Sequence, residues 1–267
     1  MKAATLTKTL AVASFAALGV ANSVNAATFP DFTVDPTAYD RFNVGITSFT
    51  ADKITGNYVE VITFGAGTFN FSILWQAGQF VANDGTVPVN AGTTGLGFDY
   101  GLYATYEGSG TFTPGPTTTF SLTPGGTLDV YIDPNNNTTF TPPGTGGNPF
   151  TPAGNGEDVH IADGVGLFGS GSLNTTCSGG INCGSFGQTT SFVLDQPQGG
   201  QFFPFPNPFY NVSFQSGQFN LFQVAQTQTT NGSLDVVFGR VPEPATLALL
   251  GVGLLGLGLT RRGQSKG

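Results

Sequence analysis

Short apolar runs separated by turn-forming residues are the feature that most constrains the fold of this chain. The clearest runs are residues 58–64 and 68–75, in which polar and apolar residues partly alternate and which Gly65-Ala66-Gly67 separate. Alternation with a period of two is typical of a strand with one buried face, and a glycine-rich link of this length is typical of a hairpin. The same pattern predicts further strands at residues 79–81, 100–106, 191–194, 210–214, 219–224 and 234–238. We therefore expect an all-β domain in residues 27–240, an antiparallel β-sandwich of jelly-roll-like character.

Aromatic residues supply the bulk for such a core, since the chain has 25 Phe and 7 Tyr. Trp75 suits either a sandwich core or stacking on a sugar ring, and the core is favoured because aromatic side chains dominate protein cores. The aromatic-proline stretch 202–209 is interpreted as a covering loop packed by its phenylalanines rather than as an exposed adhesive patch. Residues 134–157, almost all Pro, Gly, Asn and Thr, are expected to form an exposed loop.

Thr-Pro pairs recur in the middle of the chain. They follow apolar residues at positions 113–114, 123–124, 141–142 and 151–152. Proline has no amide donor and interrupts strand pairing, so these pairs are predicted to mark strand ends.

The charge of residues 27–240 excludes several classes of partner. This part of the chain has 15 acidic residues and three basic ones, Arg41, Lys53 and Arg240, which gives a net charge of −12. Such a surface repels phosphate backbones, so nucleic-acid binding is not expected. It also repels anionic lipid headgroups, so contact with a membrane is predicted only through a C-terminal helix.

The N-terminus has the pattern of a secretory signal peptide in residues 1–26. Lys2 and Lys8 precede an apolar segment at residues 10–20 that is too short for a membrane anchor. Small residues then stand three and one positions before a cleavage site after Ala26, with cleavage after Ala27 as the second choice. The expected partners at this end are the secretory translocon and signal peptidase.

The C-terminal residues 241–267 combine three parts in a fixed order. A short motif is followed by the apolar run 245–259, predicted to be a transmembrane helix, and then by a basic tail. This run of 15 residues is shorter than the roughly 20 that span a bilayer comfortably, and the arginines behind it would stay in the cytoplasm. The motif and tail residues are Val241, Pro242, Glu243, Pro244, Arg261 and Arg262.

This arrangement resembles the PEP-CTERM sorting signal of Gram-negative bacteria. The resemblance implies processing by exosortase, a membrane protease-transpeptidase. It also implies an exported protein that is held briefly in the inner membrane and then reaches the cell surface or the extracellular matrix.

The two cysteines, Cys177 and Cys183, are predicted to form a disulfide. Their even number in an exported chain and the two glycines between them favour a short closed loop. A metal site would need more ligands, and the single histidine of the chain is His160.

Catalysis, cofactors and metals are not expected. No motif selects a serine to work with His160, which in its strand-like Val-His-Ile context is interpreted as a structural residue. A glycosidase needs only two suitably spaced carboxyl groups, and five acidic residues remain available for that role: Glu107, Asp129, Glu157, Asp158 and Asp163.

Calcium ligands have a simpler explanation as turn residues. Asp133 with Asn135 and Asn137, or Asn155 with Asp158, offer oxygen ligands, but Thr138 and Gly144 break the EF-hand pattern. Asx-turns explain the same residues without an ion.

The exported part also resembles the flocculation-associated PEP-CTERM proteins of floc-forming bacteria. The segments that carry this resemblance are residues 49–60, 75–85, 180–187 and 207–210. It implies a non-enzymatic matrix or surface protein that promotes cell aggregation with exopolysaccharide. A released carbohydrate-binding module is the alternative, and a polysaccharide hydrolase is a third hypothesis.

Overall fold

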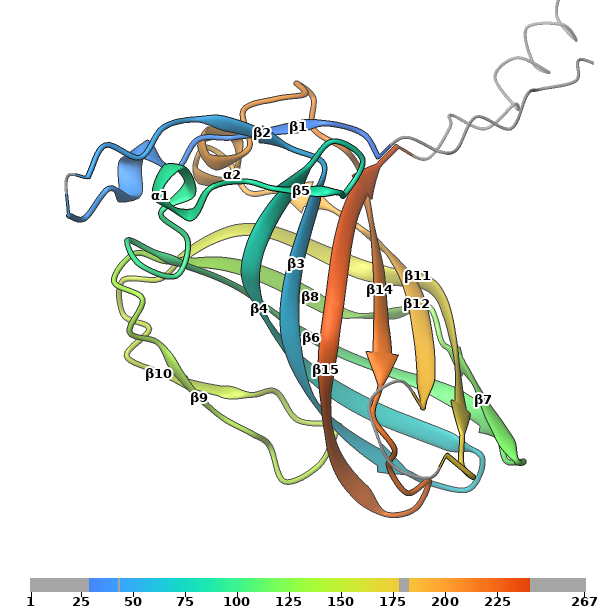
Figure 1. The fold of residues 1–267 in the computed structure, drawn as a ribbon. Coiled ribbons are helices and arrows are strands. Elements are labelled where there is room, and N and C mark those ends of the chain that lie inside the picture. The colour runs from blue at the N-terminus through green and yellow to red at the C-terminus, as the bar shows by residue number, and fades with distance from the viewer. Residues whose placement is uncertain (1–28, 43, 178–182, 241–267) are drawn as a thin grey trace, which may run out of the picture.

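The computed structural model describes residues 29–42, 44–177 and 183–240, and antiparallel strands dominate them (Figure 1). The body consists of eight long strands: β3 (Lys53–Phe64), β4 (Thr68–Ala82), β6 (Gly101–Thr113), β8 (Gly125–Asp133), β11 (Val159–Asn174), β12 (Gly184–Ser191), β14 (Val212–Phe219) and β15 (Thr227–Gly239). The prediction of an all-β, antiparallel domain is confirmed.

The eight strands form one sheet that closes on itself. β3 pairs with β4, β4 with β6, β6 with β8 and β8 with β11; the circuit continues through β12, β14 and β15 back to β3. We call this closed sheet the cylinder. The predicted jelly-roll sandwich of two facing sheets is not confirmed. The reason is strand length: β4 joins the predicted runs 68–75 and 79–81 across Gly78, and strands this long curve around a common axis.

Shorter elements surround the cylinder. At the upper end in Figure 1 lie β1 (Phe32–Val34), η1 (Thr37–Tyr39), β2 (Phe49–Ala51), β5 (Val87–Pro88), α1 (Ala91–Thr94) and α2 (Gln198–Phe202). The remaining short strands are β7 (Thr117–Leu122), β9 (Thr139–Thr141), β10 (Thr151–Ala153) and β13 (Val193–Leu194). The described chain begins and ends at the upper end, where the rings of Phe32 and Phe238 lie 5.1 Å apart.

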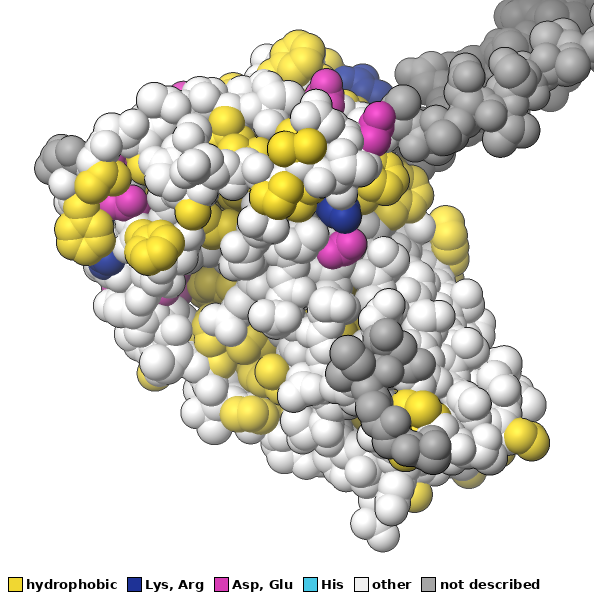
Figure 2. Space-filling view, in the orientation of Figure 1, with side chains coloured by type: hydrophobic (Ala, Val, Ile, Leu, Met, Phe, Trp, Pro, Cys, Tyr) yellow, Lys and Arg dark blue, Asp and Glu magenta, His cyan; other side chains and the backbone are white. Residues whose placement is uncertain are grey.

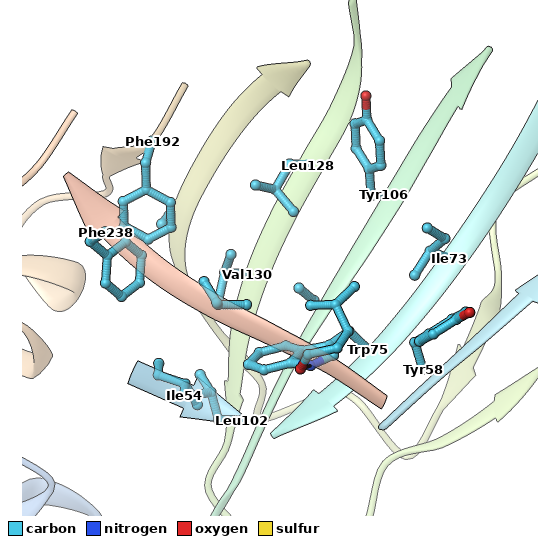
Figure 3. Packing of buried hydrophobic residues seen from close by; sticks show 14 of the residues in the cluster. Ile54, Tyr58, Ile73, Trp75, Leu102, Tyr106, Leu128, Val130, Phe192 and Phe238 are labelled. Carbon is cyan, nitrogen blue, oxygen red and sulfur yellow. Dashed lines mark hydrogen bonds between the residues drawn. The ribbon is translucent and has the colours of Figure 1, made fainter. Parts of the chain in front are cut away.

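Inward-facing side chains of alternating strand positions fill the cylinder (Figure 3). Trp75 is 5 % exposed, and its indole N–H donates a hydrogen bond of 3.1 Å to the carbonyl oxygen of Leu234. The ring therefore lies in the core and is not available to stack on a sugar, as the sequence favoured. Phenylalanine rings close the lower end of the cylinder, where Phe69 and Phe120 make an edge-to-face contact at 5.7 Å.

The aromatic-proline stretch covers the upper end. Phe202 and Phe203 are almost completely buried, and the ring of Phe203 packs 5.8 Å from that of Phe32. The predicted packed loop is confirmed, although Phe205 remains 60 % exposed.

The segment 134–158 is an arch over the outer face of the cylinder. It contains the β9–β10 pair, and the backbone N–H of Gly146 donates to the hydroxyl of Thr63 on β3. Most of the segment is exposed, as predicted, but Phe150 is 4 % exposed and packs with Val61, Leu74 and Tyr103. The polar composition of this segment gave no sign that it contains one buried aromatic residue.

Two predicted strands need correction. The run 191–194 is divided between the last residue of β12 and the short β13, and the run 219–224 is not a strand. Only Phe219 of residues 219–224 belongs to a strand, because the chain turns there and Phe222 packs into the aromatic cluster at the lower end. The Thr-Pro pairs do mark the ends of β6, β7 and β9, whereas Pro152 lies inside the short β10. Within the described residues, no helix has the length and apolar character needed to cross a membrane. The predicted signal peptide and membrane helix lie outside these residues.

Candidate functional site

The disulfide is the predicted feature that the structure places directly. Cys177 and Cys183 are bonded, with their Cα atoms 5.7 Å apart, and they join the end of β11 to the start of β12. The backbone N–H of Cys183 donates to the carbonyl oxygen of Phe219, which ties the loop to β14. The sorting residues Val241, Pro242, Glu243, Pro244, Arg261 and Arg262 and the cleavage residues Ala26 and Ala27 lie outside the described residues.

The single histidine of the chain lies between two carboxylates on the outer face of the cylinder. His160 on β11 has its Nε2 atom 3.2 Å from an oxygen of Asp129 and its Nδ1 atom 3.1 Å from an oxygen of Asp195. The ring of Tyr131 on β8 lies 4.9 Å from the imidazole, edge to face. We call these four residues the His160 cluster. His160 is neither a core residue nor part of a serine triad among the described residues, because both of its nitrogens face carboxylates.

Strand register assembles this cluster. His160 pairs directly with Tyr131 in the β8–β11 ladder, and Asp129 stands two residues before Tyr131 on the same face. Asp195 comes from the turn before α2. The sequence offered no signal for this arrangement, since His160, the Asp129–Tyr131 strand and Asp195 come from three separate parts of the chain.

A second set of contacts continues the cluster toward the arch. The ring of Tyr103 stacks on that of Tyr131 at 5.2 Å, and the ring of Phe140 packs against Tyr103 at 4.8 Å. The phenol of Tyr103 donates a 2.6 Å hydrogen bond to Asp158, and the hydroxyl of Thr138 donates to the same carboxylate. Burial raises the pKa of Asp158, and these two donors oppose that rise.

Glu107 lies beside the cluster on β6. Burial is the larger cause that raises the pKa of its carboxyl group, and the charge of Asp129 adds to the effect. Its Oε1 atom is buried without a hydrogen-bond partner, as is the hydroxyl of Ser72, directly opposite on β4. A carboxyl group with a raised pKa beside a second carboxyl group resembles the pair of acids that hydrolysis of a glycosidic bond uses.

Of the remaining predicted acids, one also lies beside this pairing. Asp163 is exposed on β11 directly opposite Asp129. Glu157 instead accepts a 2.6 Å hydrogen bond from the amide of Asn135, which lowers the pKa of Glu157. Of the five acids, the structure thus brings Glu107, Asp129 and Asp163 onto the adjacent strands β6, β8 and β11.

The calcium candidates form turns. The carboxylate of Asp133 accepts the backbone N–H groups of Asn135 and Thr138 at 3.1 and 2.8 Å, and the N–H of Asp158 donates to the carbonyl oxygen of Asn155. Among the described residues, no three His, Cys, Asp or Glu side chains form a group that could hold a metal ion.

An acidic residue inside the cylinder escaped the sequence analysis. Glu60 on β3 is 5 % exposed, and burial raises its pKa to about 8. It borders a cavity of about 30 Å³, next to one of about 70 Å³ that shares Gln188 as a lining residue. The signal was present, because Glu60 has the same parity as the inward residues Tyr58 and Ile62.

Size decides what these two cavities hold. One buried water needs roughly 10–15 Å³, and an apolar cavity that binds benzene measures roughly 150 Å³. The interior therefore suits a few waters around Glu60 and excludes a drug-sized ligand.

Comparison with known proteins identifies a known motif in one part of the chain. The family model for the PEP-CTERM protein-sorting motif matches residues 240–262. No curated protein and no solved structure matches the chain. The chain therefore carries the sorting motif of exosortase-processed proteins, which identifies it as an exported, membrane-transiting protein with exosortase as its processing partner.

Proposed function

We propose that the folded domain is a non-enzymatic surface or matrix protein that promotes cell aggregation by contact with exopolysaccharide. The carrying observation is the position of the sorting motif. β15 ends at Gly239 and the match begins at residue 240, so processing of the motif leaves every strand of the cylinder intact. A domain exported in this way meets the material outside the cell as a complete fold.

The chemistry of the surface supports contact with a polyhydroxylated partner. The His160 cluster presents carboxylate oxygens on the outer face, and such oxygens accept hydrogen bonds from hydroxyls. The strongly negative charge favours dispersion of the free protein and disfavours nucleic acid as the partner.

Hydrolysis is the second candidate, and Glu107 beside Asp129 is the observation that favours it. A hydrolase would release reducing ends from exopolysaccharide and would lose this activity when Glu107 becomes Gln. A binding protein would retain exopolysaccharide without releasing reducing ends, and Glu107→Gln would leave retention within about twofold.

The test is a pull-down of the full-length protein, extracted in mild detergent, on purified exopolysaccharide with a reducing-sugar assay of the supernatant. We expect retention without sugar release. Sugar release that Glu107→Gln abolishes would establish the hydrolase instead, and absence of retention would overturn the proposed function. Protein recovered only in the culture medium of cells with active exosortase would identify the released carbohydrate-binding module.

A further inference from the structure

A hollow of about 650 Å³ lies at the upper end of the cylinder beside α1. Three large apolar side chains around it are unusually exposed: Phe42 at 60 %, Val44 at 63 % and Phe98 at 67 %. Figure 2 shows hydrophobic side chains gathered together with a basic one at the corner where α1 lies in Figure 1. The volume of the hollow falls within the roughly 300–1,000 Å³ typical of small-molecule sites. An exposed apolar patch of this kind marks an interaction surface.

Arg41 is fixed at this hollow. Its guanidinium donates to the carbonyl oxygens of Phe98, at 2.8 Å, and of Asn135, and its central carbon lies 4.4 Å from the centroid of the Phe42 ring. Two of its five N–H donors are thus used. The group is held in place before any ligand arrives, which lowers the entropy cost of binding.

The charge of Arg41 is not neutralised by a neighbouring acid. Within the described part of the chain, no carboxylate lies within 4 Å of its guanidinium, whereas Lys53 pairs with Asp235 at 3.3 Å. Two acids lie beside Arg41 in the sequence or in the hollow: Asp40 accepts the N–H groups of Val44 and Gly45, and Asp99, which lines the hollow, accepts that of Phe42. Arg41 is therefore a positioned cation in a domain of net charge −12.

The floor of the hollow is open to a ligand at Gly97. Gly92, Gly95 and Gly97 line it, and a β-carbon at Gly97 would meet no atom within 4 Å, whereas one at Gly95 would lie 3.0 Å from a carboxylate oxygen of Asp99. Gly97 also has a φ of +80°, which a residue with a side chain rarely adopts. A ring can therefore lie over the glycines with its apolar face toward Phe42 and Phe98.

We propose that this hollow binds a uronate residue within an otherwise neutral saccharide. The carboxylate of the uronate would accept hydrogen bonds from the guanidinium of Arg41, a pairing that guanidinium groups favour. The apolar face of the sugar would lie on the phenylalanine rings. A densely charged polyanion fits less well, since the domain as a whole repels it. This inference rests on the proposed function and specifies the class of sugar.

The probes are xylotriose carrying one glucuronate and, as its neutral counterpart, xylotetraose. Calorimetry with the full-length protein in mild detergent should show the acidic probe bound more tightly. Arg41→Gln should weaken binding of the acidic probe about tenfold or more, to the level of the neutral one, since a hydrogen bond to a charged group contributes roughly 1.5–3 kcal/mol. Phe98→Ala should weaken both probes by a similar factor.

Matched controls isolate the site. Lys53→Gln changes the net charge by the same amount as Arg41→Gln, and Phe205→Ala removes a ring as exposed as Phe42. Both should bind like the wild type. Phe98→Ala keeps the carbonyl group that holds Arg41 and removes a largely exposed ring, so its effect does not depend on folding; melting curves verify this for each variant.

Two outcomes overturn the site: equal binding of both probes that Arg41→Gln does not change, or no binding of either probe by the wild type. If cells still require the protein to aggregate in either case, the proposed function stands without this site. If cells that lack the protein aggregate normally, the proposed function itself fails, whatever the probes show.

Discussion

Glu60 is an acidic residue at an inward position of its strand, and the neighbouring inward positions carry apolar side chains. Its Oε2 atom has no hydrogen-bond partner, and the hydroxyl of Thr230, paired with it on β15, has none either. An unpaired buried carboxylate is so unfavourable that the group retains its proton instead. At neutral pH, Glu60 is thus a protonated side chain in the cylinder.

The pKa of Glu60 makes stability depend on pH. Between the ordinary value of 4.5 and the folded value of about 8, the folded protein holds a proton that the unfolded chain releases. The free energy of unfolding should therefore fall as pH rises through this window, by an amount on the order of 5 kcal/mol, and level off above it. Glu60→Gln should remove this decline, as measured by denaturant unfolding between about pH 4 and 9, a range that spans the window.

The matched control is Glu157→Gln, which changes a partly exposed acid whose pKa is lowered. This variant should keep the decline of the wild type. A wild-type protein whose stability is level across the window would contradict a protonated Glu60.

At the scale of the secondary-structure elements, the Cys177–Cys183 disulfide closes the loop between β11 and β12. Closing so short a loop stabilises the fold by about 2 kcal/mol in the chain-entropy relation. Replacing both cysteines with Ser should therefore lower the melting temperature without preventing folding. Two reactive thiols in the exported wild-type protein would refute the disulfide.

The arch depends on Phe150 for its contact with the cylinder. Truncation of a buried phenylalanine costs roughly 3–5 kcal/mol, and here that loss falls on the arch rather than on the ladders beneath it. Phe150→Ala should make residues 134–158 the first site cut by proteinase K, while the body melts at nearly the wild-type temperature.

Phe168→Ala is the control for the arch, because this ring is 64 % exposed on β11. It should leave both the cleavage pattern and the melting temperature unchanged. Loss of the whole fold in Phe150→Ala would instead mean that the arch is part of the cooperative body.

At the scale of the whole molecule, the ends of the described chain lie together at the upper end of the cylinder. The sorting motif therefore begins where the fold ends. We predict from the sequence that prolines at positions 242 and 244 favour an extended segment on which a protease can act.

Changing Pro242, Glu243 and Pro244 to Ala should block processing for this reason. The variant should remain in the membrane fraction at full length, and its cells should aggregate less, as immunoblots of fractions and settling assays would show. Pro142→Ala with Pro143→Ala is the control, since it alters a proline pair in the arch and should be processed normally. Wild-type surface material that still ends at Gly267 in mass spectrometry would refute sorting by cleavage.

Several properties were determined by the sequence alone because they depend on local order. The turn glycines of the β3–β4 hairpin, the prolines after β6, β7 and β9, the short spacing of Cys177 and Cys183 and the motif at residues 240–262 each act within a few neighbouring residues. Alternation likewise indicated the strands, and the usual place of aromatic side chains in cores indicated the burial of Trp75.

Closure of the cylinder and the surface sites were decided only by tertiary structure. Closure depends on pairings such as β15 with β3, which join residues far apart in the chain. The His160 cluster depends on the register of β8 and β11, and the Arg41 hollow on two loops that meet near α1. Each requires that distant segments pack in one arrangement, and no local pattern encodes that choice, because its free energy comes from contacts that exist only after folding.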